Sequence, residues 1–144
     1  MTARILVVDD SPSDVGLIRE ALRQINSTAE LSVVEDGEEA IDYILRRGRH
    51  AAAARPHLVL LDLNLPRKSG TEVLREIKAD ATIKGIPIVI LSSSRSTDEI
   101  LHCYDCHANS YVAKPEDLDD FYEAIKNIHL FWLNTVELPG RMRQ

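Results

Sequence analysis

Five short apolar runs alternate with five longer stretches of helical periodicity along this chain. The runs lie at residues 5–8, 31–34, 57–61, 86–91 and 110–113. Strands and helices that alternate in this way, joined by right-handed crossovers, build a parallel sheet with helices on both faces. The sequence therefore predicts an α/β protein of the doubly wound (βα)5 type, with a five-stranded parallel sheet.

The composition limits the class of protein. A chain of 144 residues has the length of one domain. Seventeen Lys and Arg stand against 23 Asp and Glu, for a net charge of −6. Without a basic stripe, neither nucleic acid nor an anionic membrane is an expected partner. No apolar stretch approaches the ~20 residues that span a bilayer, and the N-terminus lacks a signal-peptide pattern, so we expect a cytoplasmic protein.

Charged residues stand where three of the apolar runs end. They are Asp9 and Asp10 after the first run, Asp62 after the third and Lys114 after the fifth. In an open parallel sheet, binding sites form at the carboxyl ends of the strands. Three converging carboxylates repel one another unless a cation lies among them, and oxygen ligands favour a hard ion such as Mg²⁺. The pattern predicts a site for a metal ion and an anion.

Further residues at characteristic spacings carry a family resemblance. They are Pro66, Gly70, Ser92, Tyr111 and Pro115. Together with the strand-end charges, their order from about residue 3 to about residue 130 resembles the receiver domain of two-component response regulators, the CheY-like family. The resemblance implies a flavodoxin-like sheet of strand order 2-1-3-4-5 with helices on both faces.

The resemblance gives the acidic residues their roles. Asp62 would be the phosphoryl acceptor, because a carboxylate can act as a nucleophile and form an acyl phosphate. Asp10 would bind Mg²⁺ directly and Asp9 mostly through water. Asp62 would be a third ligand and the backbone carbonyl of Asn64 a fourth, with waters completing the octahedron. The ion would neutralise charge that builds on the transferred group.

Three other residues receive roles from the same resemblance. Lys114 would pair with the phosphoryl oxygens, and a cis peptide bond before Pro115 would aim it at the site. Ser92 would donate its hydroxyl to a phosphoryl oxygen. Its inward movement would leave space that Tyr111 fills, which would make the two residues a two-state switch.

These roles predict a single-domain response regulator that takes a phosphoryl group from a sensor histidine kinase and signals by protein contact. Its target would be a downstream effector or a phosphotransfer protein. It would not be an enzyme, since it would catalyse only its own phosphoryl transfer and dephosphorylation. The long loop before His57, the NLPRKSG turn and the FWLNTVELP ending also resemble the response regulators of bacterial phytochrome kinases.

The end of the chain departs from the minimal fold. We expect a receiver domain over residues 1–130 and a C-terminal extension over residues 131–144. The extension opens with consecutive apolar residues, including Phe131 and Trp132. Such residues cannot all face inward on a helix, so some form an exposed patch that indicates a partner. We expect a homodimer with Phe131 and Trp132 at its interface.

Two alternatives use the same acidic residues. A haloacid-dehalogenase-like phosphatase also has a strand-end Asp, Mg²⁺ and a Lys. It normally carries two aspartates separated by one residue after its first strand, whereas Asp9 and Asp10 are adjacent. A receiver that serves as a phosphate sink, or as an adaptor with an inactive site, is the second alternative.

The segment CYDCH, residues 103–107, matches the C-x-x-C-H pattern of haem attachment. It lies within a helical pattern that the α/β fold needs, so Cys103 and Cys106 are more simply small apolar side chains. His107 stands near a helix end where receiver domains often carry Gly. We therefore expect a left-handed backbone at His107.

Overall fold

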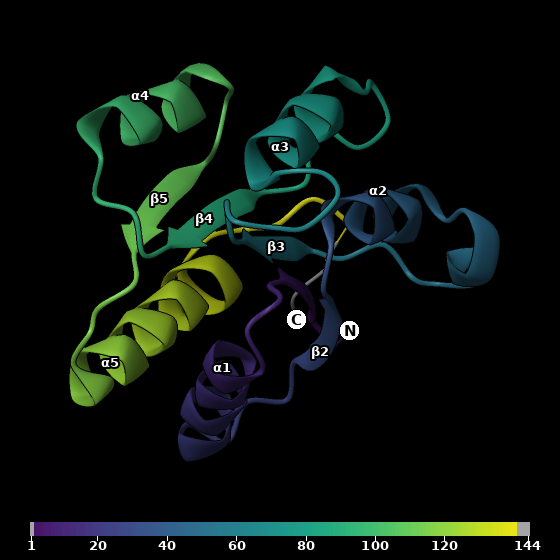
Figure 1. Ribbon diagram of the computed structural model, residues 1–144. Helices are drawn as coiled ribbons and strands as arrows, with labels where there is room; N and C mark the ends of the chain where they lie inside the picture. The colour runs from purple at the N-terminus through teal and green to yellow at the C-terminus, as the bar shows by residue number, and fades with distance from the viewer. Residues whose placement is uncertain (1, 141–144) are drawn as a thin grey trace.

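The sheet has the predicted topology. The computed structural model describes residues 2–140 and contains five parallel strands in the order β2-β1-β3-β4-β5 (Figure 1). The strands are β1 (Arg4–Val8), β2 (Glu30–Val34), β3 (Leu58–Leu61), β4 (Ile88–Ser92) and β5 (Ser110–Ala113). The CheY-like strand order that the resemblance implies is thereby confirmed.

Helices cover both faces of this sheet. They are α1 (Pro12–Gln24), α2 (Gly37–Leu45), α3 (Gly70–Ala79), α4 (Thr97–Asp105) and α5 (Leu118–His129). Figure 1 shows α1 and α5 on one face and α2, α3 and α4 on the other. Each face has its own apolar core: Ile18 and Ile125 belong to the first, and Ile44 and Leu74 to the second. The doubly wound architecture follows from these two cores.

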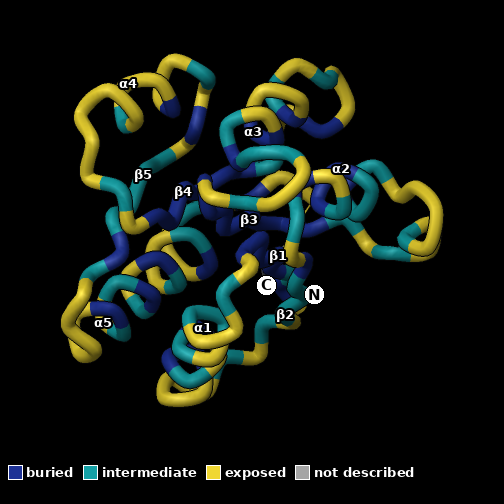
Figure 2. Tube along the Cα trace, viewed as in Figure 1, coloured by how far each residue is buried: buried dark blue, intermediate teal, exposed yellow. Residues whose placement is uncertain are grey.

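The three central strands are the most buried part of the chain (Figure 2). All four residues of β3 and all five of β4 are buried, whereas β5 at the sheet edge is half-buried throughout. Strands covered on both faces need apolar side chains on both sides, which explains why their sequences do not alternate. The polar residues at the ends of these strands are therefore attached to a buried scaffold.

Two local features lie outside the regular βα repeat. The loop between α2 and β3 contains a short 3₁₀ turn, η1 (Gly48–His50). His107 follows α4 with φ of 71°, so the expected left-handed backbone is confirmed. Among residues 2–140, no helix is both long enough and apolar enough to cross a bilayer.

The extension begins as a continuation of α5. A π-helical segment, η2 (Leu130–Thr135), carries the chain past the last regular helix. Leu133 is buried and Trp132 is half-buried against the α1/α5 core, whereas Leu130 and Phe131 are 57% and 49% exposed. Residues 141–144 of the predicted extension lie outside the described residues.

Candidate functional site

The strand ends bring three carboxylates together. Val8 of β1 pairs in register with Leu61 of β3, so the next residues, Asp9 and Asp62, emerge side by side. One carboxylate oxygen from each of Asp9, Asp10 and Asp62 lies within 4.8 Å of the others. Asp9 and Asp62 are 2% and 8% exposed, while Asp10 is exposed to solvent. The predicted acidic cluster is therefore present, with one side open to water.

Lys114 reaches this cluster from the end of β5. Its backbone N–H donates to the Ser92 carbonyl at 2.7 Å, which extends the pairing of β4 with β5. Its ammonium Nζ lies 2.9 Å from Asp9 Oδ2, 3.2 Å from Asp62 Oδ2 and 2.7 Å from Asp14 Oδ2. Lys114 is only 8% exposed, so these carboxylates replace the water it has lost.

Asp14 is a site residue that the sequence analysis missed. It lies in the first turn of α1, four residues after Asp10, and its N–H donates to the Ser11 side chain that caps the helix. The sequence offered one signal for this role, an acidic residue in the first turn of the helix that begins just after Asp9 and Asp10. An acid there is also a common helix-stabilising choice, so the pattern did not single it out.

One ammonium, that of Lys114, bonds to three carboxylates, so negative charge is in excess at the site. Burial raises the pKa of Asp9, and the hydrogen bonds from Lys114 and from the Ser11 N–H do not fully offset it. Burial alone would lower the pKa of Lys114, but its bonds to Asp14 and Asp9 outweigh burial and raise it. With Asp10 also in the cluster, four carboxylates face one ammonium, and a divalent cation would relieve this excess of negative charge.

Asp62 is held in place by the loop that follows it. Its Oδ1 accepts hydrogen bonds from the N–H of Leu63 at 2.7 Å and of Asn64 at 3.5 Å. Gly70, at the start of α3, packs so tightly that a Cβ there would lie 2.2 Å from the Asp62 carbonyl oxygen. The predicted Gly is thus needed for close approach of two backbones. With Oδ1 bonded to the loop, Oδ2 is the oxygen that faces Lys114.

Ser92 and Tyr111 meet through the loop between β4 and α4. Ser92 is fully buried at the end of β4, and its Oγ accepts from the Ser94 N–H at 3.3 Å. The hydroxyl of the half-buried Tyr111 donates to the Ser94 carbonyl at 2.8 Å. Both predicted switch residues therefore bond to the backbone of the same residue, Ser94.

The expectation of a cis peptide bond before Pro115 is wrong. No cis peptide bond occurs within residues 2–140, so the Lys114–Pro115 bond is trans. The side chain of Lys114 nevertheless reaches all three of its carboxylate partners. Pairing of β5 with β4 already places Lys114 at the strand ends, so a cis bond is not required to direct it there.

The donor atoms of the cluster fit a hard divalent cation. They are carboxylate oxygens, two of them from buried residues, and the exposed Asp10 leaves room for water to complete the coordination shell. Asn64 follows Asp62 by two residues and approaches its Oδ1 through the N–H, while its carbonyl as a ligand remains a prediction.

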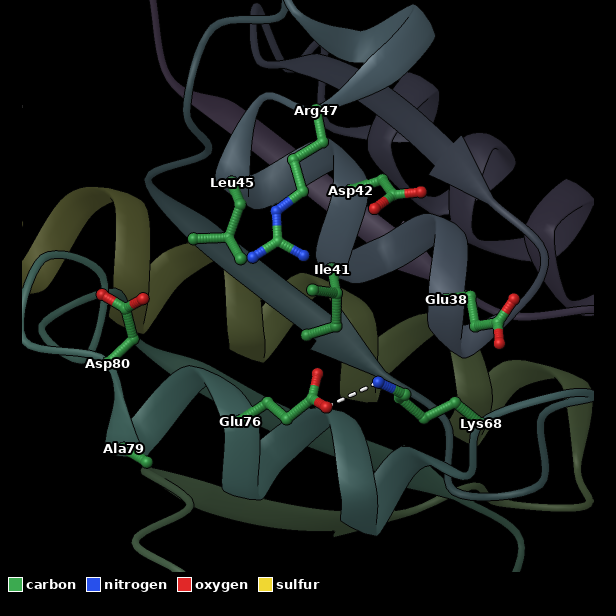
Figure 3. A pocket seen from close by; sticks show the side chains of 9 residues that line it. All are labelled: Glu38, Ile41, Asp42, Leu45, Arg47, Lys68, Glu76, Ala79 and Asp80. Atoms are coloured by element: carbon green, nitrogen blue, oxygen red, sulfur yellow. Dashed lines mark hydrogen bonds and ion pairs between the residues drawn. The ribbon is translucent and has the colours of Figure 1, made fainter.

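A separate groove lies between α2 and α3, with a volume of about 600 Å³ (Figure 3). Its lining residues are Glu38, Ile41, Asp42, Leu45, Arg47, Lys68, Glu76, Ala79 and Asp80. An ion pair joins Lys68 to Glu76 in this groove. None of the strand-end carboxylates lines it, and its charges point in several directions in Figure 3. We therefore place the functional site at the strand ends.

The cysteines belong to the fold rather than to a site. Cys103 is 1% exposed in the core beneath α4, and burial raises the pKa of its thiol to about 11. Cys106 is a half-buried residue packed against the same core. A thiol enclosed in the core cannot form a thioether with haem without unfolding α4, which agrees with the simpler interpretation.

Comparison with known proteins identifies the family. The profile of the response regulator receiver domain matches residues 5–126. Response regulator Rcp1 of Synechocystis sp. is 41% identical over 136 residues, which cover 94% of this chain and 92% of Rcp1. The chain therefore belongs to the response regulator receiver family. This membership does not favour the phosphatase alternative.

Solved structures support the narrower resemblance to phytochrome response regulators. The phosphorylated cyanobacterial phytochrome response regulator RcpA superposes with a TM-score of 0.94 at 46% identity, covering 97% of this chain and 100% of RcpA. The Mn²⁺-bound form of Rcp1 gives 0.92 at 40% identity, with 96% and 99% covered. The bacteriophytochrome response regulator RtBRR gives 0.76 at 35% identity, with 97% and 86% covered. The chain is a homologue of phytochrome response regulators.

Proposed function

We propose that this receiver accepts a phosphoryl group on Asp62 from the phosphohistidine of a sensor histidine kinase and signals by protein contact. The main support for this proposal is the position of the Lys114 ammonium, which lies 3.2 Å from Asp62 and beside a cluster of three carboxylates. This combination supplies a nucleophile, a cation for the phosphoryl oxygens and oxygen ligands for a metal.

The chemistry uses groups already in position. An oxygen of Asp62 forms a bond to phosphorus while the bond from phosphorus to the imidazole nitrogen breaks, and that nitrogen keeps the electron pair. The Lys114 N–H that now bonds to Asp62 turns to a phosphoryl oxygen. Lys114 gives up no proton, because its raised pKa keeps it charged. The chain thus acts on itself rather than turning over a substrate.

The metal would be held by Asp9, Asp10 and Asp62, with the Asn64 carbonyl as a further ligand. A bound Mg²⁺ would neutralise the negative charge that the transferred group brings to the carboxylates. The relative Rcp1 has a solved Mn²⁺-bound form, which supports the binding of a divalent cation. Mg²⁺ is the cation we assign, because the donors are all oxygen and one side is open to water.

Ser92 and Tyr111 would report phosphorylation to the surface. If the Ser92 hydroxyl turns to a phosphoryl oxygen, it releases the Ser94 N–H that it now accepts from. The Ser94 carbonyl holds Tyr111, so a shift of this backbone unit would free the Tyr111 ring to move inward. Phosphorylation would thus bias a two-state element at the β4–α4 loop.

The kinase and the dimer are parts of the same proposal. Similarity to RcpA and RtBRR supports a phytochrome histidine kinase as the phosphoryl donor.

The receiver would span residues 1–130, with residues 131–144 as a dimerisation extension. The exposed Phe131 ring contacts Trp132 edge-on, at 5.1 Å between centroids, which gives a second copy an aromatic surface to bind. The signal would pass to an effector or a phosphotransfer protein.

Incorporation of labelled phosphate from a small acyl phosphate tests this function. We expect the chain to incorporate label with Mg²⁺, to lose this activity with a chelator, and to show none as Asp62→Asn. Asp105→Asn is the matched control, because Asp105 is an exposed acid at the end of α4. Equal labelling of Asp62→Asn and the unchanged chain would overturn the proposal, and multiple turnover of a small phosphate ester would favour the phosphatase instead.

A further inference from the structure

Asp14 makes the shortest of the three bonds to Lys114, although it follows no strand. Its Oδ2 lies 2.7 Å from Lys114 Nζ, against 2.9 Å for Asp9 and 3.2 Å for Asp62. The Ser11 cap fixes its backbone at the first turn of α1. The contact therefore joins the first helix to the end of the last strand, across the phosphoryl site.

The three partners of Lys114 are not equivalent. An ammonium has three N–H donors, and here each of them meets one carboxylate. Asp9 and Asp62 belong to the cluster that would hold a cation, whereas Asp14 is not among the carboxylates grouped there. When a cation and a phosphoryl group occupy the site, Asp14 is the partner with no competing role.

We propose that Asp14 is a positioning residue for phosphoryl transfer, which holds the Lys114 ammonium so that one N–H stays directed at Asp62 and at the group it accepts. The inference rests on the function proposed above. Without the Asp14 carboxylate, the ammonium loses its shortest bond and its one partner outside the acidic cluster. Its N–H groups are then less firmly directed at Asp62 and at the incoming phosphoryl oxygens, so charge on the transferred group is stabilised less.

Glu116 provides a matched comparison. It lines the same hollow of about 340 Å³ as Asp14 and Lys114, two residues beyond the lysine. It is exposed, and none of the three ion pairs of Lys114 involves it. Glu116→Gln therefore removes the same charge beside the site without removing a bond to the lysine.

The test compares the initial rates of phosphate incorporation for Asp14→Asn and Glu116→Gln. The donor is a labelled small acyl phosphate with Mg²⁺, whose oxygen–phosphorus bond breaks as the Asp62 oxygen bonds to phosphorus and the donor carboxylate leaves. We expect Asp14→Asn to react roughly three- to tenfold more slowly, as for the loss of one charge-assisted bond, and Glu116→Gln to react at the unchanged rate. Asn keeps the size of Asp and an acceptor oxygen, and urea unfolding verifies that each variant is folded.

A Lys114→Ala background adds a readout that a purely structural role of Asp14 would not change. If Asp14 acts through the lysine, Asp14→Asn will not slow the residual reaction of Lys114→Ala over long incubation. Equal rates for Asp14→Asn and the unchanged chain, or equal slowing by Glu116→Gln, would overturn the proposal. Failure of the function itself looks different, because the unchanged chain would then take up no label.

Discussion

The hydroxyl of Tyr111 on β5 donates a hydrogen bond to the backbone carbonyl of Ser94, 2.8 Å away in the loop that follows β4. The N–H of the same Ser94 is bonded to the side chain of Ser92. One residue of loop backbone therefore lies between the two side chains of the proposed switch, and its position would change when Ser92 changes partner.

Removing the Tyr111 hydroxyl should loosen that loop. We expect Tyr111→Phe to lower the free energy of unfolding by about 1 kcal/mol, the usual worth of one intramolecular hydrogen bond. Amide hydrogen exchange should accelerate at residues 93–96, while phosphate incorporation on Asp62 keeps its rate. Tyr122→Phe on α5 serves as the control, and unchanged exchange in Tyr111→Phe would show that the bond does not restrain the loop.

The close approach of Gly70 to Asp62 predicts that alanine substitution has opposite effects on stability at Gly70 and at Gly16. Gly70→Ala should destabilise the fold by about 1–3 kcal/mol, because its Cβ would overlap backbone atoms that cannot move aside. Gly16→Ala on α1 is the opposite case, since a Cβ there meets nothing within 4 Å. We expect it to stabilise the helix by about 1 kcal/mol. Urea unfolding of both variants checks the sign, and a destabilised Gly16→Ala would contradict the account.

The raised pKa of Asp9 predicts how stability depends on pH when no divalent ion is present. Between its ordinary value of 3.8 and the higher folded value, the folded state binds more protons than the unfolded state. The contribution of Asp9 to stability therefore falls as pH rises through that window. Relative to the unchanged chain, Asp9→Asn should therefore gain stability as pH rises through that window.

Urea unfolding with a chelator, from about pH 4 to pH 8, measures this difference. Adding Mg²⁺ should stabilise the unchanged chain above the same window, where Asp9 is charged, and should stabilise Asp9→Asn much less. If the difference in stability between the two chains stayed constant across the pH range, burial of Asp9 would not lower the stability of the charged form.

The extension offers a test of the proposed dimer. Phe131 is half exposed whereas Trp132 packs partly against the core, so Phe131→Ser should weaken association with little loss of stability. Trp132→Ala should weaken both. Light scattering before and after addition of a phosphoryl analogue gives the mass. A monomer for the unchanged chain in both states would count against the dimer.

Much of the fold and the site could be predicted because both depend on where strands end. Val8 and Leu61 are paired, so the acids after them had to meet, and Lys114 follows a strand in the same sheet. Asp14 was missed because its contact depends on how α1 is rotated against the sheet, which residue spacing does not specify. The Tyr111 contact with Ser94 depends on the path of an irregular loop, which no periodicity encodes.

The proposed function requires that Asp62 itself carries the phosphoryl group. Borohydride reduction of the phosphorylated chain, followed by peptide mass spectrometry, converts an aspartyl phosphate to homoserine and locates it. We expect homoserine at position 62 alone, and only when Mg²⁺ and the phosphoryl donor were both present. Reduction at another acidic residue, or a phosphate that survives as an ester or on a histidine, would contradict it.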